Sequence, residues 1–594
     1  MSAYYAAYTN KTKREGRVDS DLRLRVLALA SLFVAILMIV RLLVVMVFQH
    51  DFYTKLAQGS HEMYAQLFPL RGQIFVQDSR SKETFAVAVN KYFYSLFADS
   101  RQISSEEEAD DIATRLGNIL QYDDEKKLQL FLELSKRDDP YVPIEAKVTE
   151  QVKAQVESLA LSGIHFVKKP YRIYPEHGFA AQTIGFLGKD EQGHDVGRYG
   201  IEGYHQDILD GEGGFVSGAR AAGGGFISFA GLDFQPAQNG SDITLTIDRG
   251  VQDASCTFLR EAMEYYESQS ASLVIMEPQT GAIRAMCSLP DFDLNEYSQV
   301  DDISVYNNST IFTPYEPGSV FKPIPIASAV NEGLIGPETY FYDTGKVEGV
   351  CEKPIQNADQ HVYEDTDMTG VLIDSINTGM VHTADLLGKK RFLRYIEDFG
   401  FGVKTGVGLD TEAAGNIQTL SINSGDDLDC YGATASFGQG ITVTPLQLAA
   451  AYSAIANGGY LPRPYVVESV KFADGKQERT KPEMIRQVLE SQSASLTSAM
   501  LVSVIDGGHG KAAGVPGYYV AGKTGTAQIP GKGGYTSETI HSFVGFAPIE
   551  NPRFVLVVKL EKPQRGGYSS STAAPTFGKI VKFLLQYYRV PPTR

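Results

Sequence analysis

The chain has 594 residues, of which 43% are hydrophobic, and a formal net charge of −17 at pH 7. This length and hydrophobic content suit two or three globular units, each with its own core, and exclude a disordered or fibrous protein. The acidic balance excludes the large basic face that nucleic-acid-binding proteins need, so no nucleic-acid partner is expected.

The first predicted element is a membrane-spanning helix over residues 26–48. This run is apolar apart from Ser31 and Arg41, and at 1.5 Å per residue it spans roughly 34 Å, enough to cross a bilayer core of ~30 Å. The tail at residues 1–25 has three more basic than acidic side chains, which favours a cytoplasmic N-terminus. We therefore expect a single-pass protein of the cell membrane, with the rest of the chain outside the cytoplasm. A cleaved signal peptide is the competing interpretation, but no small-residue cleavage site follows the run.

Residues 49–240 are predicted to form a first exported domain of mixed α and β structure. Short β-like runs alternate there with acidic helical stretches such as residues 104–116. The Gly-rich passage at residues 211–225 lacks the strand, helix and lysine of a phosphate loop, so we expect an ordinary loop.

Residues 241–594 are predicted to form a second domain of the α+β class. A strand at residues 243–247 precedes a helix whose apolar face is formed by Val251, Ala254, Phe258 and Ala262. Two pairs of strands flank turn sequences, at residues 271–276, 282–287, 542–547 and 553–560, and a helix at residues 576–588 closes the chain. Hairpins at both ends with helices between them predict an antiparallel sheet covered by helices.

Ser319-Val320-Phe321-Lys322 is the first of three motifs that carry chemistry in this domain. Pro317 and Gly318 before it mark a turn, and the apolar stretch after it predicts a helix. Residues i and i+3 share one helix face, so the Lys322 amine can reach the Ser319 hydroxyl. Serine is a weak nucleophile on its own, but a lysine that is desolvated near other cations can lose its proton and activate it.

The other two motifs are Ser375-Ile376-Asn377 and Lys523-Thr524-Gly525, and each of the three has a decoy in the chain. The decoys are Ser79–Lys82, Ser421–Asn423 and Lys404–Gly406. Context separates them, because Lys523 continues a strand-like run from residue 518, whereas the decoys at Ser79 and Lys404 lie in a polar stretch and a loop. Gly525 has no side chain, so a substrate backbone could approach that strand closely.

The ordered set SxxK, SxN and KTG is typical of serine β-lactamases and penicillin-binding proteins. The chain resembles the class B penicillin-binding proteins over nearly its whole length, most clearly in YEPGSVFKP at residues 315–323, FGQGITVTPLQLAAAY at residues 437–452 and AGKTGTAQ at residues 521–528. Within that class it is most similar to the septal, FtsI-type enzymes, since Asn377 fills a position that is often Asp in the elongation-specific branch.

The resemblance implies a transmembrane anchor at residues 26–48, an extended α/β pedestal or dimerisation-like domain at residues 49–240, and a transpeptidase domain at residues 241–594. The last would have the antiparallel sheet and flanking helices of a serine β-lactamase. RGQI at residues 71–74, TIGFLG at residues 183–188 and GIEG at residues 200–203 resemble pedestal motifs. Arg71 and Glu202 are candidates for an ion pair there, the alternative being two solvated charges.

The resemblance also implies a serine-type D,D-transpeptidase of peptidoglycan. Ser319 would attack the carbonyl between the two terminal D-alanines of a stem pentapeptide, and an amine of a neighbouring stem peptide would then take the acyl group. Lys322 would be the base for acylation. Ser375 would shuttle a proton with Lys523 nearby, and Asn377 would hold a substrate amide and help to order Lys322.

The KTG strand would bind the substrate in this resemblance. Thr524 and Thr526, on either side of Gly525, would meet the substrate carboxylate. The backbone N–H groups of Ser319 and Thr526 would form an oxyanion hole, whose individual donors are worth ~3 kcal/mol of barrier in comparable serine enzymes. A β-lactam would occupy the same place and acylate Ser319 for a long time.

No cofactor and no metal are expected. The four cysteines and ten histidines show no metal-ligand spacing. A disulfide between Cys351 and Cys430 is chemically permitted in an exported domain, but the sequence does not show that the two meet. The expected partners are peptidoglycan stem peptides, β-lactams, a polytopic membrane glycosyltransferase of the FtsW type and other division proteins. The glycosyltransferase is expected because residues 49–240 resemble no glycosyltransferase module.

Two other functions use the same motifs. A D,D-carboxypeptidase or a β-lactamase would differ only in using water to resolve the acyl-enzyme. A non-catalytic β-lactam sensor or division scaffold would keep the site as a binding module, but intact SxN and KTG motifs argue against a dead site.

Overall fold

The computed structural model describes residues 32, 33, 36, 38, 62–67, 69–219, 233–422 and 425–594. The chain divides into two compact units, residues 1–68 with 213–238 and residues 69–212 with 239–594. In the first unit, β8 (Gly214–Ala219) pairs antiparallel with both β1 (Glu62–Leu67) and β9 (Asp233–Gln235). The prediction of a loop over residues 211–225 is therefore wrong for β8, because its pairing partners come from distant segments and leave no signal in its own composition.

The predicted membrane segment lies mostly outside the described residues. Leu32, Phe33, Ile36 and Met38 are helical and exposed. Among the residues that are described, none of the helices combines the length and the hydropathy that a bilayer crossing needs.

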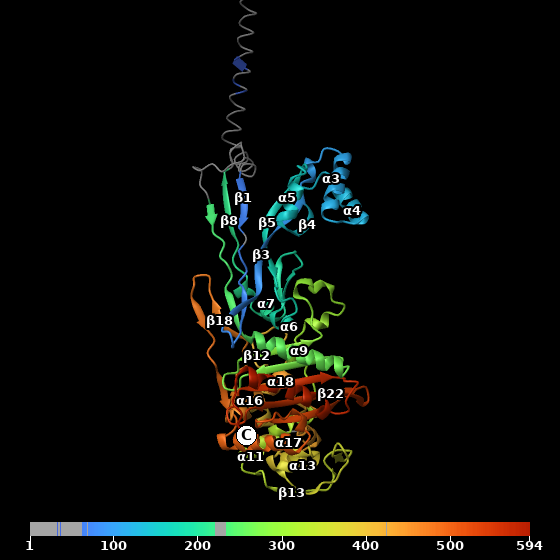
Figure 1. Cartoon of the computed structure of the whole chain (residues 1–594), viewed down its shortest axis with the longest axis vertical. Coiled ribbons are helices and arrows are strands. Elements are labelled where there is room, and N and C mark those ends of the chain that lie inside the picture. Colours follow the sequence, from blue (N-terminus) through green and yellow to red (C-terminus); the bar gives the residue numbers. More distant parts are fainter. Residues whose placement is uncertain are drawn as a thin grey trace, which may run out of the picture. The chain divides into compact units, whose positions relative to one another are not determined.

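The second unit contains a seven-stranded sheet that joins the predicted pedestal to the predicted transpeptidase domain (Figure 1). Its strands, in chain order, are β2 (Ile74–Gln77), β3 (Thr84–Ala98), β4 (Val142–Val148), β5 (Ile164–Ile173), β10 (Asp242–Asp248), β18 (Val467–Lys471) and β19 (Gln477–Arg479). β10 is the predicted strand after residue 241, and it runs parallel to β2. One hydrogen-bonded sheet therefore contains strands from both sides of the predicted domain boundary.

Three helices pack beside β3 and β4 around a separate small core. They are α3 (Glu106–Ile119), α4 (Asp124–Leu134) and α5 (Glu150–Glu157). The Ser105 side chain caps α3 by accepting a hydrogen bond from the Glu108 backbone, which satisfies one of the free N–H groups of the first turn. The predicted helix over residues 104–116 is thus confirmed, with its start at the capping serine.

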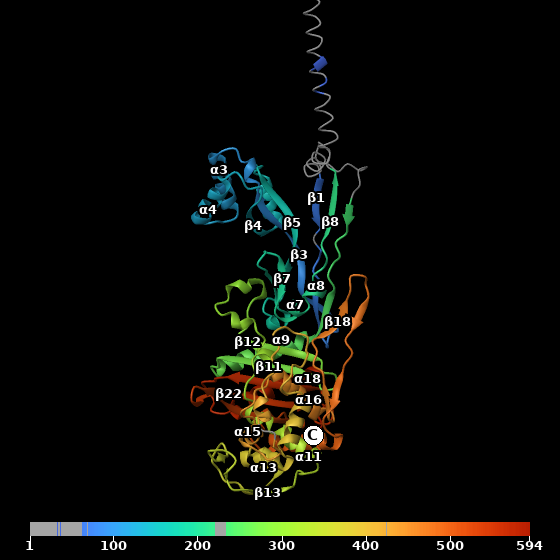
Figure 2. The same cartoon turned by 180° about the vertical axis from the view of Figure 1, so that it is seen from behind.

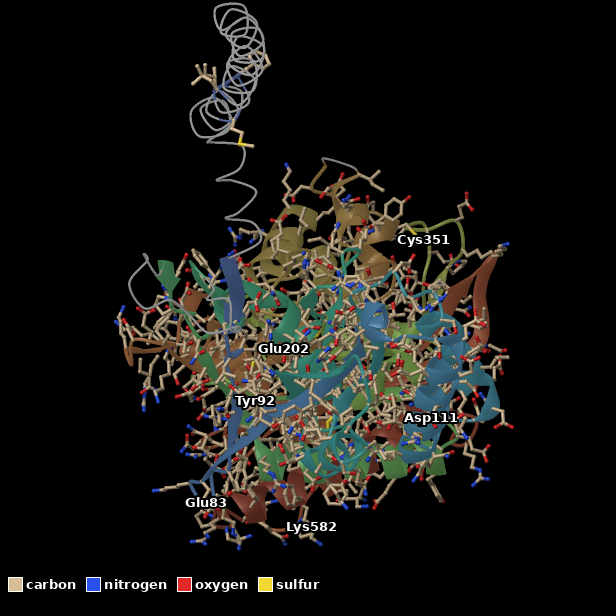
Figure 3. The ribbon with its side chains drawn as sticks, turned by 90° about the horizontal axis from the view of Figure 1, so that it is seen from above. Glu83, Tyr92, Asp111, Glu202, Cys351 and Lys582 are labelled. Carbon is tan, nitrogen blue, oxygen red and sulfur yellow. A yellow bond between two sulfur atoms is a disulfide. The ribbon has the colours of Figure 1, made fainter. Side chains whose placement is uncertain are left out.

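A buried ion cluster holds the pedestal strands and the GIEG motif together. The Arg71 and Arg172 guanidiniums each donate to the Glu202 carboxylate at 2.7 Å, and the Tyr174 hydroxyl donates to it at 3.2 Å. Glu202, labelled in Figure 3, is fully buried, unlike Glu83 and Asp111 in the same view. The predicted pairing of Arg71 with Glu202 is confirmed, and the alternative of two solvated charges is wrong.

The transpeptidase region is built on a five-stranded antiparallel sheet. Its order is β12 (Ile283–Leu289), β11 (Ser270–Met276), β23 (Phe554–Glu561), β22 (Gly534–Ala547) and β21 (Ala521–Gly531). All four predicted strands are present, and β22 begins eight residues earlier than the predicted start at 542, at Gly534. This confirms the antiparallel α+β architecture.

Helices cover both faces of this sheet (Figures 1 and 2). α9 (Arg249–Tyr265) and α18 (Ala573–Tyr587) pack on one face, and α16 (Pro445–Ala456) packs on the other. Side chains alternate along β11, so that Leu273 packs in the core beneath α9 and α18 and Val274 packs in the core beneath α16. The buried stripe of α9 includes Ser255 and Leu259, one position beyond the predicted Ala254 and Phe258, which are half-buried.

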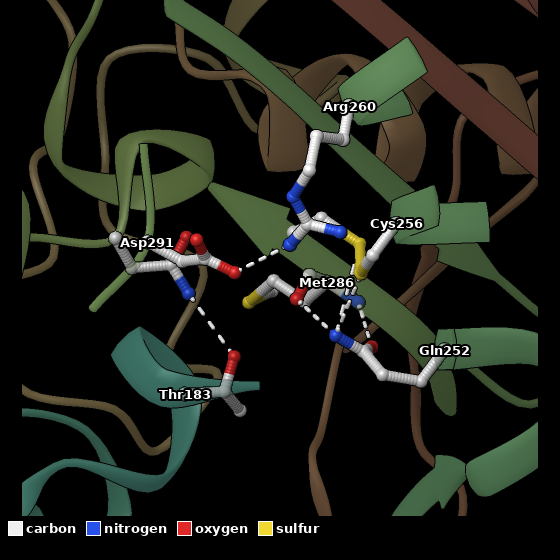
Figure 4. The surroundings of a disulfide bond; sticks show 8 residues. Thr183, Gln252, Cys256, Arg260, Met286 and Asp291 are labelled. Carbon is white, nitrogen blue, oxygen red and sulfur yellow. Dashed lines mark hydrogen bonds and ion pairs between the residues drawn. A yellow bond between two sulfur atoms is a disulfide. The ribbon is translucent and has the colours of Figure 1, made fainter. Parts of the chain in front are cut away.

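Two disulfides bridge the transpeptidase region. Cys351 pairs with Cys430, and Cys256 of α9 pairs with Cys287 of β12, a bond that the sequence did not reveal. A hollow of about 220 Å³ lies beside the Cys256–Cys287 bond. Figure 4 shows its polar groups bonded to one another: Gln252 donates to the Met286 carbonyl at 2.9 Å, and Arg260 pairs with Asp291 at 2.6 Å.

Replacing Glu202 with Gln is expected to lower the free energy of unfolding by about 3–5 kcal/mol, because two buried guanidiniums lose the buried carboxylate that they share. The measurement is chemical denaturation of the purified full-length protein in detergent. Asp195→Asn, in the exposed pair with Lys189, is the control and should leave stability unchanged, since exposed pairs contribute little. Equal stabilities for both variants and the parent would contradict the structural role of the cluster.

Candidate active site

Ser319 lies in a tight turn that leads directly into a buried helix. The turn is the 3₁₀ helix η5 (Gly318–Phe321), followed by α11 (Pro323–Asn331). Gly318 has φ +59°, a conformation that glycine adopts readily. Its N–H donates to the Gly438 carbonyl at 3.0 Å, so the loop at residues 437–440 supports the turn. Ser319 is half-buried between fully enclosed neighbours, which leaves its hydroxyl reachable while its backbone is fixed.

Lys322 lies one turn after Ser319 and its side chain is completely buried. The amine lies within hydrogen-bonding distance of three oxygens, the Ser375 carbonyl at 2.5 Å, the Ser375 hydroxyl at 3.2 Å and the Asn377 Oδ1 at 2.8 Å. Lys322 therefore connects the first two predicted motifs. Among the hydrogen bonds of the described residues, those of the Lys322 amine go to the SxN motif and not to the Ser319 hydroxyl.

Ser375 presents two oxygens to Lys322 because its backbone is in the left-handed region. Its φ is +59°, a conformation that costs a non-glycine residue about 1–3 kcal/mol and is maintained only by its surroundings. Asn377 follows at the first position of α13 (Asn377–Leu387). The kink before this helix turns both the hydroxyl and the carbonyl of Ser375 toward the same amine.

Lys523 approaches the same serine from the sheet. It lies on β21, is completely buried, and donates to the Ser375 hydroxyl at 3.1 Å. Its amine also contacts the Thr524 carbonyl at 3.3 Å. The Ser375 hydroxyl therefore lies within hydrogen-bonding distance of two lysine amines, which bring all three motifs together.

Burial determines the charge of these two lysines. It lowers the pKa of Lys322 well below the usual value, and the neighbouring Lys523 lowers it further. Burial also lowers the pKa of Lys523 to about 7, although the Asp374 carboxylate partly opposes this change. The site thus combines an amine at Lys322 whose neutral form is favoured with a second amine, Lys523, that is close to its titration point at neutral pH, a pairing suited to acid–base chemistry.

The strand that carries Lys523 also carries the predicted binding residues. Thr524 is buried, and the Thr526 hydroxyl donates to the Ser569 hydroxyl and accepts from the Ser569 backbone N–H, both at 3.0 Å. Gly525 faces the nucleophile turn, because a Cβ there would lie 2.8 Å from Val320 Cγ1. The glycine therefore allows the turn and the strand to approach each other closely.

Ser569 and His541 support this strand and were not found from the sequence. Ser569 begins the 3₁₀ helix η8 (Ser569–Ser571) between β23 and α18, and His541 is opposite Thr526 in the register of β22. The His541 ring bonds to the hydroxyls of Thr539 and Thr572, and burial lowers its pKa to about 4. Neither residue belongs to a local motif, so only the pairing of strands distant in sequence reveals them.

The decoy motifs lie elsewhere. Ser79–Lys82 forms an exposed turn between β2 and β3. In the loop at Lys404–Gly406, Thr405 is occupied by hydrogen bonds to Glu412. Ser421 ends a short 3₁₀ helix, and Asn423 is outside the described residues. Over the described ranges, no three His, Cys, Asp or Glu side chains are grouped so that they could bind a metal ion.

Two families match this chain. Residues 66–245 match the Penicillin-binding Protein dimerisation domain, and residues 271–582 match the Penicillin binding protein transpeptidase domain. These matches agree with a pedestal region followed by a catalytic region.

Curated relatives and solved structures agree with the family matches. Stage V sporulation protein D of Bacillus subtilis is 33% identical over 91% of this chain and 82% of its own length, and PbpB of Mycobacterium tuberculosis is 32% identical over 71% of this chain and 63% of its own. A peptidoglycan synthetase from Bifidobacterium adolescentis superposes with a TM-score of 0.70 at 25% identity, covering 90% of this chain and 98% of that one. Penicillin binding protein 3 of Mycobacterium tuberculosis, solved with aztreonam, has a TM-score of 0.67 at 25% identity, with 89% and 98% covered. The chain therefore belongs to the class B penicillin-binding proteins.

Proposed function

We propose that the chain is a peptidoglycan D,D-transpeptidase that crosslinks stem peptides through an ester on Ser319. The observation that carries this proposal is the convergence of two buried amines on the Ser375 hydroxyl, at 3.2 Å from Lys322 and 3.1 Å from Lys523. An acyl transfer needs a proton acceptor for the attacking hydroxyl and a proton donor for the leaving amine. A pair of lysines joined by one serine can supply both.

Acylation begins when the Ser319 oxygen attacks the carbonyl carbon between the two terminal D-alanines. Lys322, whose neutral form is favoured because burial lowers its pKa well below the usual value, accepts the hydroxyl proton. The C–N bond then breaks, and the departing amine of D-alanine takes a proton from Ser375, which Lys523 replaces. An ester between Ser319 and the penultimate D-alanine remains.

Crosslinking reverses these proton movements with a different amine. The acceptor amine of a neighbouring stem peptide attacks the ester carbonyl and gives up a proton, Ser319 leaves and takes one, and an amide forms. In both steps the tetrahedral oxyanion would be held by the N–H groups of Ser319 and Thr526. Preorganised donors of this kind are typically a large term in such catalysis.

The KTG strand would hold the substrate. Thr524 and Thr526 would bind the terminal carboxylate, while Asn377 would bind a substrate amide in addition to Lys322. The solved relative from Mycobacterium tuberculosis was crystallised with aztreonam and with ampicillin. We infer that β-lactams likewise acylate Ser319 in this chain, since the ring amide takes the place of the D-alanyl bond.

The proposed place of the reaction rests on the amino-acid sequence. Residues 26–48 are proposed to anchor the chain once in the cell membrane, with residues 1–25 in the cytoplasm and the domains at 49–240 and 241–594 outside. The relatives include both a sporulation protein and a protein described as an FtsI homologue, which is 28% identical. We favour a role in cell division, alongside a polytopic glycosyltransferase of the FtsW type that supplies the glycan strands.

A fluorescent penicillin should label the purified full-length protein on Ser319, and Ser319→Ala should abolish the label because no other hydroxyl occupies the turn. The measurement is gel fluorescence followed by mass spectrometry of the labelled peptide. Ser79→Ala, in the decoy motif, is the matched control and should label normally. Rapid loss of label would favour a β-lactamase, and an unlabelled but folded protein would favour the scaffold alternative.

The acylation rate should fall as the pH rises above neutrality. Lys523 has its pKa lowered to about 7, so it is charged and able to supply a proton below pH 7 and neutral above it. The rate should fall about tenfold per pH unit well above that value. Lys523→Arg, whose guanidinium stays charged, should remove the alkaline decline even if the rate is lower. A decline that persists in Lys523→Arg would exclude this role.

A further inference from the structure

Helix α13, which begins with the catalytic Asn377, has no capping side chain of its own. The residue before it, Ile376, offers no acceptor, and no side-chain cap is formed within the helix. The first N–H groups of a helix have no partner inside the helix and need an acceptor from elsewhere when they are buried. The strained Ser375, two residues before this helix, increases the need for an external support.

Asn357 supplies that acceptor from a segment 20 residues earlier in the chain. Its Oδ1 accepts the backbone N–H of Asn377 at 3.0 Å and that of Thr378 at 3.3 Å. The adjoining Gln356 carbonyl accepts from Asn377 Nδ2 at 2.9 Å, while Asn377 Oδ1 accepts from Lys322. Two consecutive residues therefore fix both the backbone and the side-chain orientation of Asn377.

Asp343 anchors Asn357 from behind. Asp343 Oδ2 accepts from Asn357 Nδ2 at 2.8 Å, and Oδ1 accepts from the Thr378 hydroxyl at 2.6 Å. Burial favours the neutral acid, but hydrogen bonds from Thr378, Tyr363, Gly345 and Asn357 outweigh it and keep the pKa of Asp343 below its usual value. The carboxylate thus remains charged and acts as a fixed acceptor.

The support is buried and connected on every side. Asp343 is completely buried and Asn357 is 3% exposed, so water does not replace these bonds readily. The remaining Asn357 Nδ2 hydrogen bond goes to the His361 carbonyl at 3.0 Å. The Cys351–Cys430 disulfide joins the same segment to α15 (Cys430–Ala435). A satisfied buried network of this kind defines one arrangement.

We propose that Asn357, held by Asp343, is a positioning residue for the acylation of Ser319: it fixes the start of α13 so that Ser375 and Asn377 meet the Lys322 amine. It acts through the SxN motif, by accepting the backbone N–H groups of Asn377 and Thr378. A displacement of about 1 Å in such an arrangement can cost on the order of 100-fold in rate. The inference rests on the proposed function, because it assigns a role within that acylation.

The test compares acylation of full-length variants by a fluorescent penicillin, measured as a rate constant at saturating concentration. Asn357→Ala should acylate about 10- to 100-fold more slowly than the parent while remaining folded at the assay temperature, as checked by thermal unfolding. Asn295→Ala is the matched control, because Asn295 also makes two side-chain bonds to backbone, both to Tyr174 in the pedestal region. It should lose stability without losing rate.

A reciprocal exchange separates positioning from simple destabilisation. Asn357→Asp should acylate slowly because its carboxylate would face Asp343. Combining it with Asp343→Asn restores one carboxylate–amide pair and should recover part of the rate, a coupling that independent losses of stability would not produce. Rates within twofold of the parent for Asn357→Ala, or no recovery in the double variant, would overturn the inference. Absence of label on the parent itself would instead refute the proposed function.

Discussion

The site depends on the enclosure of two amines in an interior that disfavours charge. Lys322 and Lys523 are both completely buried, and both are directed at the hydroxyl of one serine. An ammonium in such a place is costly unless it is paired, and neither amine forms a salt bridge to a carboxylate in the described residues. The interior therefore drives the lysines toward their neutral forms, and a neutral lysine beside a serine is a base.

The rest of the fold maintains this enclosure from three directions. The sheet supplies Lys523 on β21, the turn before α11 supplies Ser319 and Lys322, and the kink before α13 supplies Ser375. These segments are about 50 to 200 residues apart in the chain, so only a rigid core can hold them within hydrogen-bonding distance. Gly525 lets the turn approach the strand, and the helices on both faces of the sheet fix the strand itself.

Much of this could be predicted from the sequence because the motifs are local. β-rich runs beside turn sequences marked β11 and β23, and turn chemistry marked Ser319. The identity of the charged pair Arg71 and Glu202 also followed from motifs, but the second arginine, Arg172, did not. Its strand has no distinguishing pattern, so nothing in the local sequence indicates that Arg172 reaches Glu202.

The features that were missed share one physical cause: they arise only when distant segments meet. Ser569 bonds to Thr526, and Asn357 caps a helix to which it does not belong. Cys256 pairs with Cys287 because α9 packs on β12. The strand β8 was read as a loop for the same reason. Local propensity describes a segment alone, whereas hydrogen-bond satisfaction and packing are properties of the assembled chain.

The most direct measurement of the central claim is a titration of the lysine side chains by NMR, with isotope-labelled lysine and the Lys322→Arg and Lys523→Arg variants for assignment. The account predicts one resonance with a pKa of about 7, missing in Lys523→Arg, and another well below the ordinary value of about 10.4, missing in Lys322→Arg. If every lysine titrated near the ordinary value, both amines would be charged at neutral pH, and the mechanism would lose its base.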